Sequence, residues 1–210
     1  GFGYPGHTEY LANQTKAQKP AVMMLETANL RVVPVTIHLS LKEAIDVLSI
    51  DKIVLCTTTT ATALKQDFGI NRPCIAVAGL NPHAGEDGFL GQEEIEIITP
   101  AINQLQATGL NVIGPFASDT LFHQTARKKY DAVICMYHDQ ALIPSKTIDF
   151  YNGVNITLGL PIVRTSPDHG TAADIAGTNR ANPNSFIAAI QTAGQIAATR
   201  QDMVNAYDTA

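Results

Sequence analysis

Short apolar runs of β-forming residues alternate with helical patterns along almost the whole chain, and this alternation restricts the possible folds most strongly. The runs CIAVAG (74–79) and DAVICMY (131–137) are almost entirely apolar, so both faces of these predicted strands must be buried. Strands of this kind belong to sheets that helices cover on both sides, and the helical connections make such sheets largely parallel. The pattern therefore predicts an α/β fold with α/β/α layers around a mostly parallel or mixed sheet.

The other predicted elements follow the same alternation. PAVMMLET (20–27) and LRVVPVTIHL (30–39) are predicted to be two strands joined by a tight turn. Ser40 and Glu43 form a capping box that starts a helix. Two more strands are expected at 111–115 and 154–160, and further helices at 91–109, 119–130, 172–176 and 183–200.

Composition argues against two classes of function. The chain has 210 residues, of which 45% are hydrophobic and 16% charged, and its net charge is -5. No basic run is present, which argues against a nucleic-acid-binding surface, and no apolar stretch is long enough to span a membrane. Three widely separated cysteines without a CxxC motif favour reduced, mostly buried thiols in a cytoplasmic protein.

Three of the six histidines stand at or just after the ends of predicted strands. His38 follows VVPVTI, His83 follows CIAVAGLNP, and His138 follows DAVICMY. Ligands of α/β sheets bind at the carboxyl ends of the strands, and three neutral imidazoles are a common catalytic metal site. The alternative is three unrelated surface or turn histidines. The spacing alone favours this alternative, because the separations match no local metal-binding motif.

For two further features, the residues alone do not decide between a functional and a purely structural role. Asp139 follows His138 and could orient that imidazole or transfer a proton, or it could be an ordinary acid in the first turn of a helix. The stretch TSPDHGTAADIAGTNRANP (165–183) contains Gly170 and Gly177, which let backbone amides approach a ligand closely. Its alternative is a long surface loop. No dinucleotide fingerprint, P-loop or GxSxG motif is present.

Six motifs in one order carry a resemblance to a known family. HGTAADIAGTNRANP (169–183) resembles the cofactor loop of the β-decarboxylating dehydrogenases, the isocitrate and isopropylmalate dehydrogenase group. The other five are GHTEYLA (6–12), NPHAGE (81–86), SDTLF (118–122), MYHDQ (136–140) and GVNITLGLPIVRTSPDHGT (153–171). Taken together, these motifs make nearly the whole chain similar to the 4-hydroxythreonine 4-phosphate dehydrogenase family.

The resemblance implies a role for particular residues of each motif. A divalent metal, which is zinc, magnesium or cobalt, would be held by the same three histidines, His38, His83 and His138. Substrate contacts would fall on His7, Thr8, Lys146, Asn155 and Arg164, with Asp139 and Lys146 as the catalytic groups. NAD or NADP would be bound by His169, Gly170, Thr171, Asp174 and Asn182.

The resemblance also implies an activity and an architecture. The expected reaction is the metal-dependent oxidation of 4-phosphooxy-L-threonine by NAD or NADP, followed by decarboxylation, in pyridoxal phosphate biosynthesis. The expected molecule is a homodimer whose subunits share the metal site. Residues 1–147 would form a central metal- and substrate-binding, dimer-forming domain. Residues 148–210 would be the carboxyl-terminal part of a cofactor-binding domain, with the active site in the cleft between the two.

One departure from the family leaves other functions open. The family has a longer amino-terminal part without a counterpart here, so we expect residues 148–210 to lack sheet partners and the chain to be a fragment or inactive. One alternative function is a related dehydrogenase acting on threonate or erythronate 4-phosphate. Another is a truncated, non-catalytic module for metal binding or dimerisation.

Overall fold

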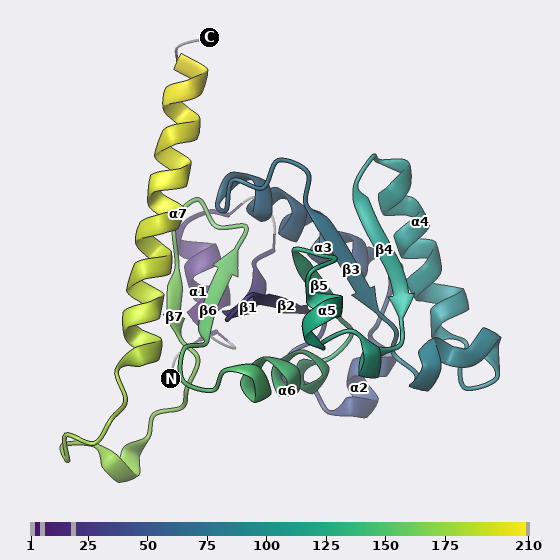
Figure 1. Ribbon diagram of the computed structural model, residues 1–210, viewed down its shortest axis with the longest axis horizontal. Coiled ribbons are helices and arrows are strands. Elements are labelled where there is room, and N and C mark those ends of the chain that lie inside the picture. Colours follow the sequence, from purple (N-terminus) through teal and green to yellow (C-terminus); the bar gives the residue numbers. More distant parts are fainter. Residues whose placement is uncertain (1–2, 5–6, 18–19, 209–210) are drawn as a thin grey trace.

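A single mixed sheet runs through the protein, for which the computed structural model describes residues 3–4, 7–17 and 20–208 (Figure 1). Within these residues the strand order is β4-β3-β5-β2-β1-β6-β7. The strands are β1 (Val22–Thr27), β2 (Leu30–Pro34), β3 (Cys74–Ala78), β4 (Asn111–Phe116), β5 (Ala132–Cys135), β6 (Val154–Leu158) and β7 (Thr165–Pro167). The α-helices are α1 (His7–Gln14), α2 (Leu41–Asp46), α3 (Ile50–Gln66), α4 (Thr99–Ala107), α5 (Gln124–Arg127), α6 (His138–Ile148) and α7 (Asn184–Asp208).

The sheet has a parallel part and an antiparallel part. Strand β5 pairs in parallel with both β2 and β3, and β3 pairs in parallel with β4. Strand β1 is antiparallel to β2 and to β6, and β7 is antiparallel to β6. The predicted α/β class with a mixed sheet is therefore confirmed. The expectation that residues 148–210 would lack sheet partners is wrong, because β6 pairs with β1 along its whole length.

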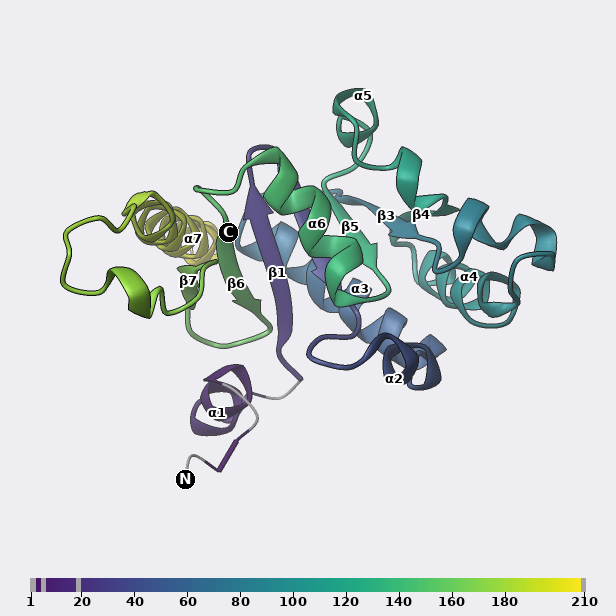
Figure 2. The same ribbon diagram turned by 90° about the horizontal axis from the view of Figure 1, so that it is seen from below.

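Helices cover both faces of this sheet, as Figure 2 shows from below. On one face, side chains of α3, α4 and α7 bury against the sheet, including Ile53, Leu105 and Ile196. On the other face a smaller cluster joins Leu25 and Val133 to α6. Alternation along each strand explains the two clusters, since successive side chains point to opposite faces. The division of the chain into two domains at residue 147 remains a prediction.

Some predicted helices differ from the observed ones. The capping box of Ser40 and Glu43 is present, but α2 ends after six residues and Ser49 caps a separate helix, α3. The helix predicted at 119–130 is wrong in most of its length. There the structure has a 3₁₀ turn (η3, Ser118–Thr120) and the four-residue α5. The final helix continues beyond the predicted end at residue 200, to Asp208, and extends past the sheet (Figure 1).

The cysteines are buried to different degrees. Cys56 and Cys135 are buried and Cys74 is half-buried, and none of them forms a disulfide. Burial raises the pKa of the Cys56 thiol to about 11, so this side chain stays protonated near neutral pH. The expectation of mostly buried thiols is therefore met. In the described part of the chain, no helix is both long and apolar enough to cross a membrane.

Candidate active site

The carboxyl ends of β2, β5 and β3 lie side by side, and two buried polar side chains join them. The Thr36 hydroxyl beyond β2 donates to the Met136 carbonyl beyond β5, at 2.8 Å. The Gln140 amide of α6 accepts from Met136 N–H and donates to the Gly79 carbonyl beyond β3, at 2.7 Å. Each of the three strands is followed by one of the predicted metal-ligand histidines. The sheet thus brings the three segments to one edge.

Two of the three histidines face one another. The ring centroids of His38 and His138 are 6.0 Å apart, with 41° between the ring planes. Two imidazoles that bind one zinc ion have centroids roughly 5–6 Å apart, because each ring nitrogen lies about 2 Å from the metal. Both rings line a cavity of about 250 Å³ together with Thr36, Tyr137 and Asp139. The separation of the two rings is thus at the upper end of the range for two ligands of one metal ion.

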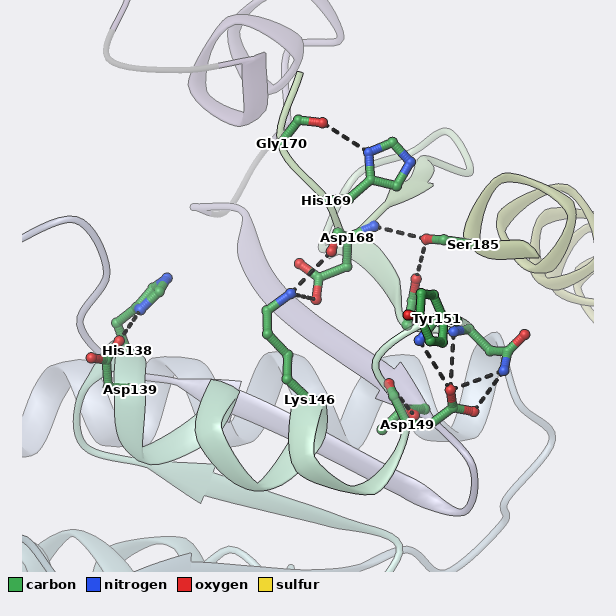
Figure 3. A network of polar contacts seen from close by, with 12 residues as sticks. His138, Asp139, Lys146, Asp149, Tyr151, Asp168, His169, Gly170 and Ser185 are labelled. Atoms are coloured by element: carbon green, nitrogen blue, oxygen red, sulfur yellow. Dashed lines mark hydrogen bonds and ion pairs between the residues drawn. The ribbon is translucent and has the colours of Figure 1, made fainter. Parts of the chain in front are cut away.

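Asp139 is both an acid in the first turn of a helix and a partner of the His138 ring. It lies in the first turn of α6, which starts at His138. Its carboxylate Oδ1 is also 2.7 Å from His138 Nδ1 (Figure 3). A carboxylate on one ring nitrogen fixes the orientation of an imidazole and leaves the other nitrogen for a metal. For His138 that nitrogen is Nε2.

His83 is held in an unusual backbone conformation. It lies in η1 (Pro82–Gly88), where five consecutive residues from His83 to Asp87 have positive φ between 44° and 81°. Such left-handed turns cost about 1–2 kcal/mol for each non-glycine residue. The His83 side chain is exposed, and no three His, Cys, Asp or Glu side chains in the described residues are close enough together to hold a metal. A single chain thus brings together His38 and His138 but not His83.

The carboxylate of Glu94 anchors the segment that carries His83. Glu94 lies in the π turn η2 (Glu94–Ile98) and its side chain is 3% exposed. Its Oε1 accepts from the backbone N–H of Leu80 at 2.6 Å and of Asn81 at 2.8 Å. Its Oε2 accepts from the Asn81 side chain at 2.8 Å. From the sequence, Glu94 is expected only as an acid favoured by the dipole at the start of the helix predicted at 91–109, and its burial and its contacts with Leu80 and Asn81 are not indicated.

Lys146 lies on the same side of α6 as His138. The two residues are eight positions apart, close to two helical turns, and both line a groove of about 480 Å³ with Leu142 and Phe150. Lys146 Nζ donates to Asp168 Oδ2 at 2.7 Å and to the Asp168 carbonyl at 3.0 Å. Asp168 went unremarked in the sequence, because 22 residues separate it from the lysine.

Asn155 lies on β6, and Arg164 lies in the β6–β7 connection, directly before β7. Asn155 is opposite Leu25 in the sheet register, and Leu25 belongs to the cluster on the α6 face. Its side-chain Oδ1 is buried and has no hydrogen-bond partner. Arg164 donates to the Thr157 hydroxyl at 3.0 Å, and burial lowers the pKa of its guanidinium. A buried acceptor without a partner and a partly desolvated cation are both expected to gain from a bound polar ligand.

The other predicted contacts lie elsewhere. His7 and Thr8 begin α1, which lies apart from α6 in both views of the ribbon (Figures 1 and 2). The predicted cofactor segment projects from the sheet between β7 and α7 (Figure 1). In this segment His169 Nδ1 contacts the Gly170 carbonyl at 2.9 Å, and Asn182 Oδ1 accepts from Asn184 N–H at the start of α7. Thr171 and Asp174 are exposed. The structure does not bring these residues together with Lys146.

Comparison with known proteins identifies the relatives of the chain. The profile of the pyridoxal phosphate biosynthetic protein PdxA family matches residues 1–193. A 4-hydroxythreonine-4-phosphate dehydrogenase of Caulobacter vibrioides is 58% identical, over 95% of this chain and 62% of that protein. One of Bradyrhizobium diazoefficiens is 56% identical, over 95% of this chain and 59% of that protein.

A solved structure agrees with these sequence matches. The crystal structure of 4-hydroxythreonine-4-phosphate dehydrogenase from Klebsiella pneumoniae superposes with a TM-score of 0.85 and 47% identity, covering 94% of this chain and 60% of that one. The chain thus spans about three fifths of the length of the curated relatives that it matches. The fold, the order of the motifs and these matches agree, and the chain belongs to the pyridoxal phosphate biosynthetic PdxA family.

Proposed function

We propose that the chain takes part in the metal-dependent oxidation of 4-phosphooxy-L-threonine by NAD or NADP, followed by decarboxylation. The observation that carries this proposal is that His38 and His138 face one another across a cavity. His138 also lines the groove along α6 in which Lys146 lies. The names of the relatives support the same reaction. A divalent ion at these imidazoles would supply a Lewis acid that favours ionisation of the substrate hydroxyl.

The chemistry assigns distinct tasks to the side chains of α6. Oxidation at C3 sends a hydride to the nicotinamide ring and a proton to a base, and it leaves a β-keto acid. This acid loses carbon dioxide and takes up a proton at the carbon that carried the carboxylate. We assign the proton transfers to Asp139 and Lys146, since both line the groove along α6. Through Nδ1, Asp139 also fixes the His138 ring.

Binding of the phosphorylated substrate requires cations and polar groups. We assign this task to Lys146, Asn155 and Arg164 from α6, β6 and the β6–β7 connection, and to His7 and Thr8 at the start of α1. Lys146 offers a point charge and Arg164 a planar fork that suits carboxylate or phosphate. His169, Gly170, Thr171, Asp174 and Asn182 are assigned to the cofactor.

We further propose that the metal site is shared between two copies of the chain. His38 and His138 would come from one subunit and His83 from its partner, because His83 is exposed and does not join the other two within one chain. The segment around His83 also exposes apolar side chains that a second copy could cover, with Phe89 85% and Ile95 51% exposed. Shared sites of this kind are incomplete in a monomer.

Subunit complementation tests the shared site. His83→Ala and His138→Ala should each lose most of the bound metal as homodimers, because two remaining ligands hold it weakly. Co-expression of the two variants should restore about a quarter of the wild-type metal content, since half of the dimers are mixed and each mixed dimer has one intact site. Co-expression of His38→Ala with His138→Ala is the control and should restore none. Equal results for both pairs would contradict sharing.

A substrate panel tests the reaction itself. The metal-loaded chain is assayed for reduction of NAD and NADP with 4-phosphooxy-L-threonine, threonate 4-phosphate and erythronate 4-phosphate. The proposal requires the first compound to be the best substrate. Preference for either sugar acid would support the related dehydrogenase instead. No turnover with any compound, at full metal occupancy, would support a non-catalytic module.

A further inference from the structure

The ammonium group of Lys146 is already engaged by a carboxylate. Its Nζ donates to Asp168 Oδ2 at 2.7 Å and to the Asp168 carbonyl at 3.0 Å, so two of its three N–H groups have partners (Figure 3). The side chains are 32% exposed for Lys146 and 17% exposed for Asp168. Partial burial strengthens such a pair relative to one in open water. The carboxylate therefore cancels much of the charge that would attract an anionic substrate group.

Asp168 is also tied to the framework through its backbone. Its N–H donates to Ser185 Oγ at 3.0 Å, and the Ser185 hydroxyl donates to the Gly153 carbonyl at 2.6 Å. Ser185 is 5% exposed at the start of α7, and Gly153 directly precedes β6. Asp168 thus stands where α6, α7 and β6 meet, immediately before the segment 169–183. The conformation of that segment at its first residue depends on how Asp168 is held.

We propose that Asp168 links the substrate site to the cofactor segment. Its carboxylate holds Lys146 until an anionic group of the substrate replaces it. This inference rests on the proposed function, in which Lys146 binds a substrate anion and the segment 169–183 binds the cofactor. A phosphate dianion outcompetes a single carboxylate because it carries more charge and three strong acceptor oxygens. Once Lys146 turns to the phosphate, the side-chain contact that holds the start of the cofactor segment is lost.

The exchange couples the occupancy of one site to the mobility of the other. If a ligand that breaks the pair loosens the segment, then linkage requires that loosening the segment favours that ligand by the same free energy. Asp168 acts here as a positioning residue, because it contacts neither the metal-binding imidazoles nor, in this scheme, the reacting atoms. Its removal should therefore change binding and mobility without removing any catalytic group.

The test compares Asp168→Asn with Asp149→Asn, using inorganic phosphate as the probe and calorimetry as the measurement on the 210-residue chain. Asparagine keeps an acceptor for Lys146 and removes the charge, so phosphate should bind about tenfold more tightly than to the wild type. Asp149 lies just beyond α6 and bonds to Asn152 rather than to Lys146, so its substitution removes the same charge without breaking the pair. That control should change phosphate affinity by less than about twofold.

Amide hydrogen exchange over residues 169–183 gives a second measurement. In the wild type, phosphate should raise the exchange rate there; in Asp168→Asn the rate should already be raised and phosphate should add nothing. Weaker or unchanged phosphate binding by Asp168→Asn would overturn the inference, as would an equal effect of Asp149→Asn. Lys146→Ala tests the proposed substrate site separately from the role of Asp168. If that variant binds phosphate as well as the wild type, the proposed substrate site itself is wrong.

Discussion

Two of the three histidines assigned to the metal have backbone conformations that non-glycine residues rarely adopt. His38 has φ 47° and His83 has φ 52°. Backbone strain of this kind costs on the order of 1–3 kcal/mol for each residue and concentrates at functional sites. At both positions the strained backbone presents an imidazole beyond the end of a strand. This is independent support for a functional role, because packing of the core would not select histidine there.

The strained backbone at His83 should have a measurable effect on stability. His83→Gly should be more stable to unfolding than His83→Ala by about 1 kcal/mol, because only alanine retains the cost of the left-handed conformation. Both variants lack the imidazole, so metal binding does not affect the comparison. Urea denaturation of the metal-free proteins measures the difference.

His123 provides a matched control in the same chain. His123 is exposed and has φ -71°, which any residue adopts. There the order should reverse, with glycine less stable than alanine because of its greater freedom in the unfolded chain. The same order at both positions would show that His83 carries no conformational cost.

Individual residues could be predicted only where a strand end marks them. The pattern of apolar runs placed His38, His83 and His138 at strand ends, but only the resemblance to the family assigned them to a metal, and the structure places two of the three face to face. The partner of Lys146 could not be predicted, because no local periodicity relates residue 146 to residue 168. The left-handed backbone conformation of His83 could not be predicted either, because no local pattern in NPHAGE indicates it.

At the scale of elements, the connection from β3 to α4 depends on one buried side chain. Glu94→Ala should lower the free energy of unfolding by about 3 kcal/mol, because the N–H groups of Leu80 and Asn81 lose their acceptor. Glu94→Gln retains an acceptor and should lose less. Exchange of the amides of residues 80 and 81 should rise in Glu94→Ala.

Glu96, two residues further along, provides the control for this prediction. It lies in the same π turn and is exposed, so Glu96→Ala should change stability by no more than about 0.5 kcal/mol. A similar loss in both variants would mean that removing any acidic side chain from this turn, and not the loss of the buried carboxylate's contacts, explains the effect.

Predicted elements were correct where burial is continuous and wrong where tertiary contacts replace periodicity. The strands β1, β3, β5 and β6 were recognisable because their residues are almost all buried. Residues 119–130 resemble a helix in composition, yet Leu121 is buried and the Tyr130 hydroxyl donates to its carbonyl, which folds the segment back on itself. The strand β7 was missed because its sequence, Thr-Ser-Pro, has no apolar signal.

At the scale of the whole molecule, a bidentate ion pair joins the last helix to the core. Arg200 of α7 donates from Nε and Nη2 to both carboxylate oxygens of Asp67, at 2.7 and 3.0 Å, and the Asp67 side chain is 5% exposed. Arg200→Ala should destabilise the fold by about 2–3 kcal/mol, since it leaves a buried carboxylate unpaired. Thermal and urea unfolding would measure this loss.

A second substitution separates the charge from the packing. Adding Asp67→Asn to Arg200→Ala should recover part of the lost stability, because no buried charge then remains. Lys65→Ala removes an exposed cation from the last turn of α3 and should have little effect. A double variant that is less stable than Arg200→Ala would show that Asp67 has a role independent of its ion pair.

The place of β5 in the sheet has a consequence for how the protein is made. Strand β5 separates β2 from β3, although all of β3 and β4 precedes it in the chain. During synthesis, residues 132–135 leave the ribosome after β1 to β4. Until then, no strand joins the β1–β2 hairpin to the β3–β4 pair. The nascent chain must therefore keep two open strand edges apart, and these edges are the natural targets of chaperones and of mispairing. Emergence of β5 closes both edges and, in the same step, carries His138 to the side of His38.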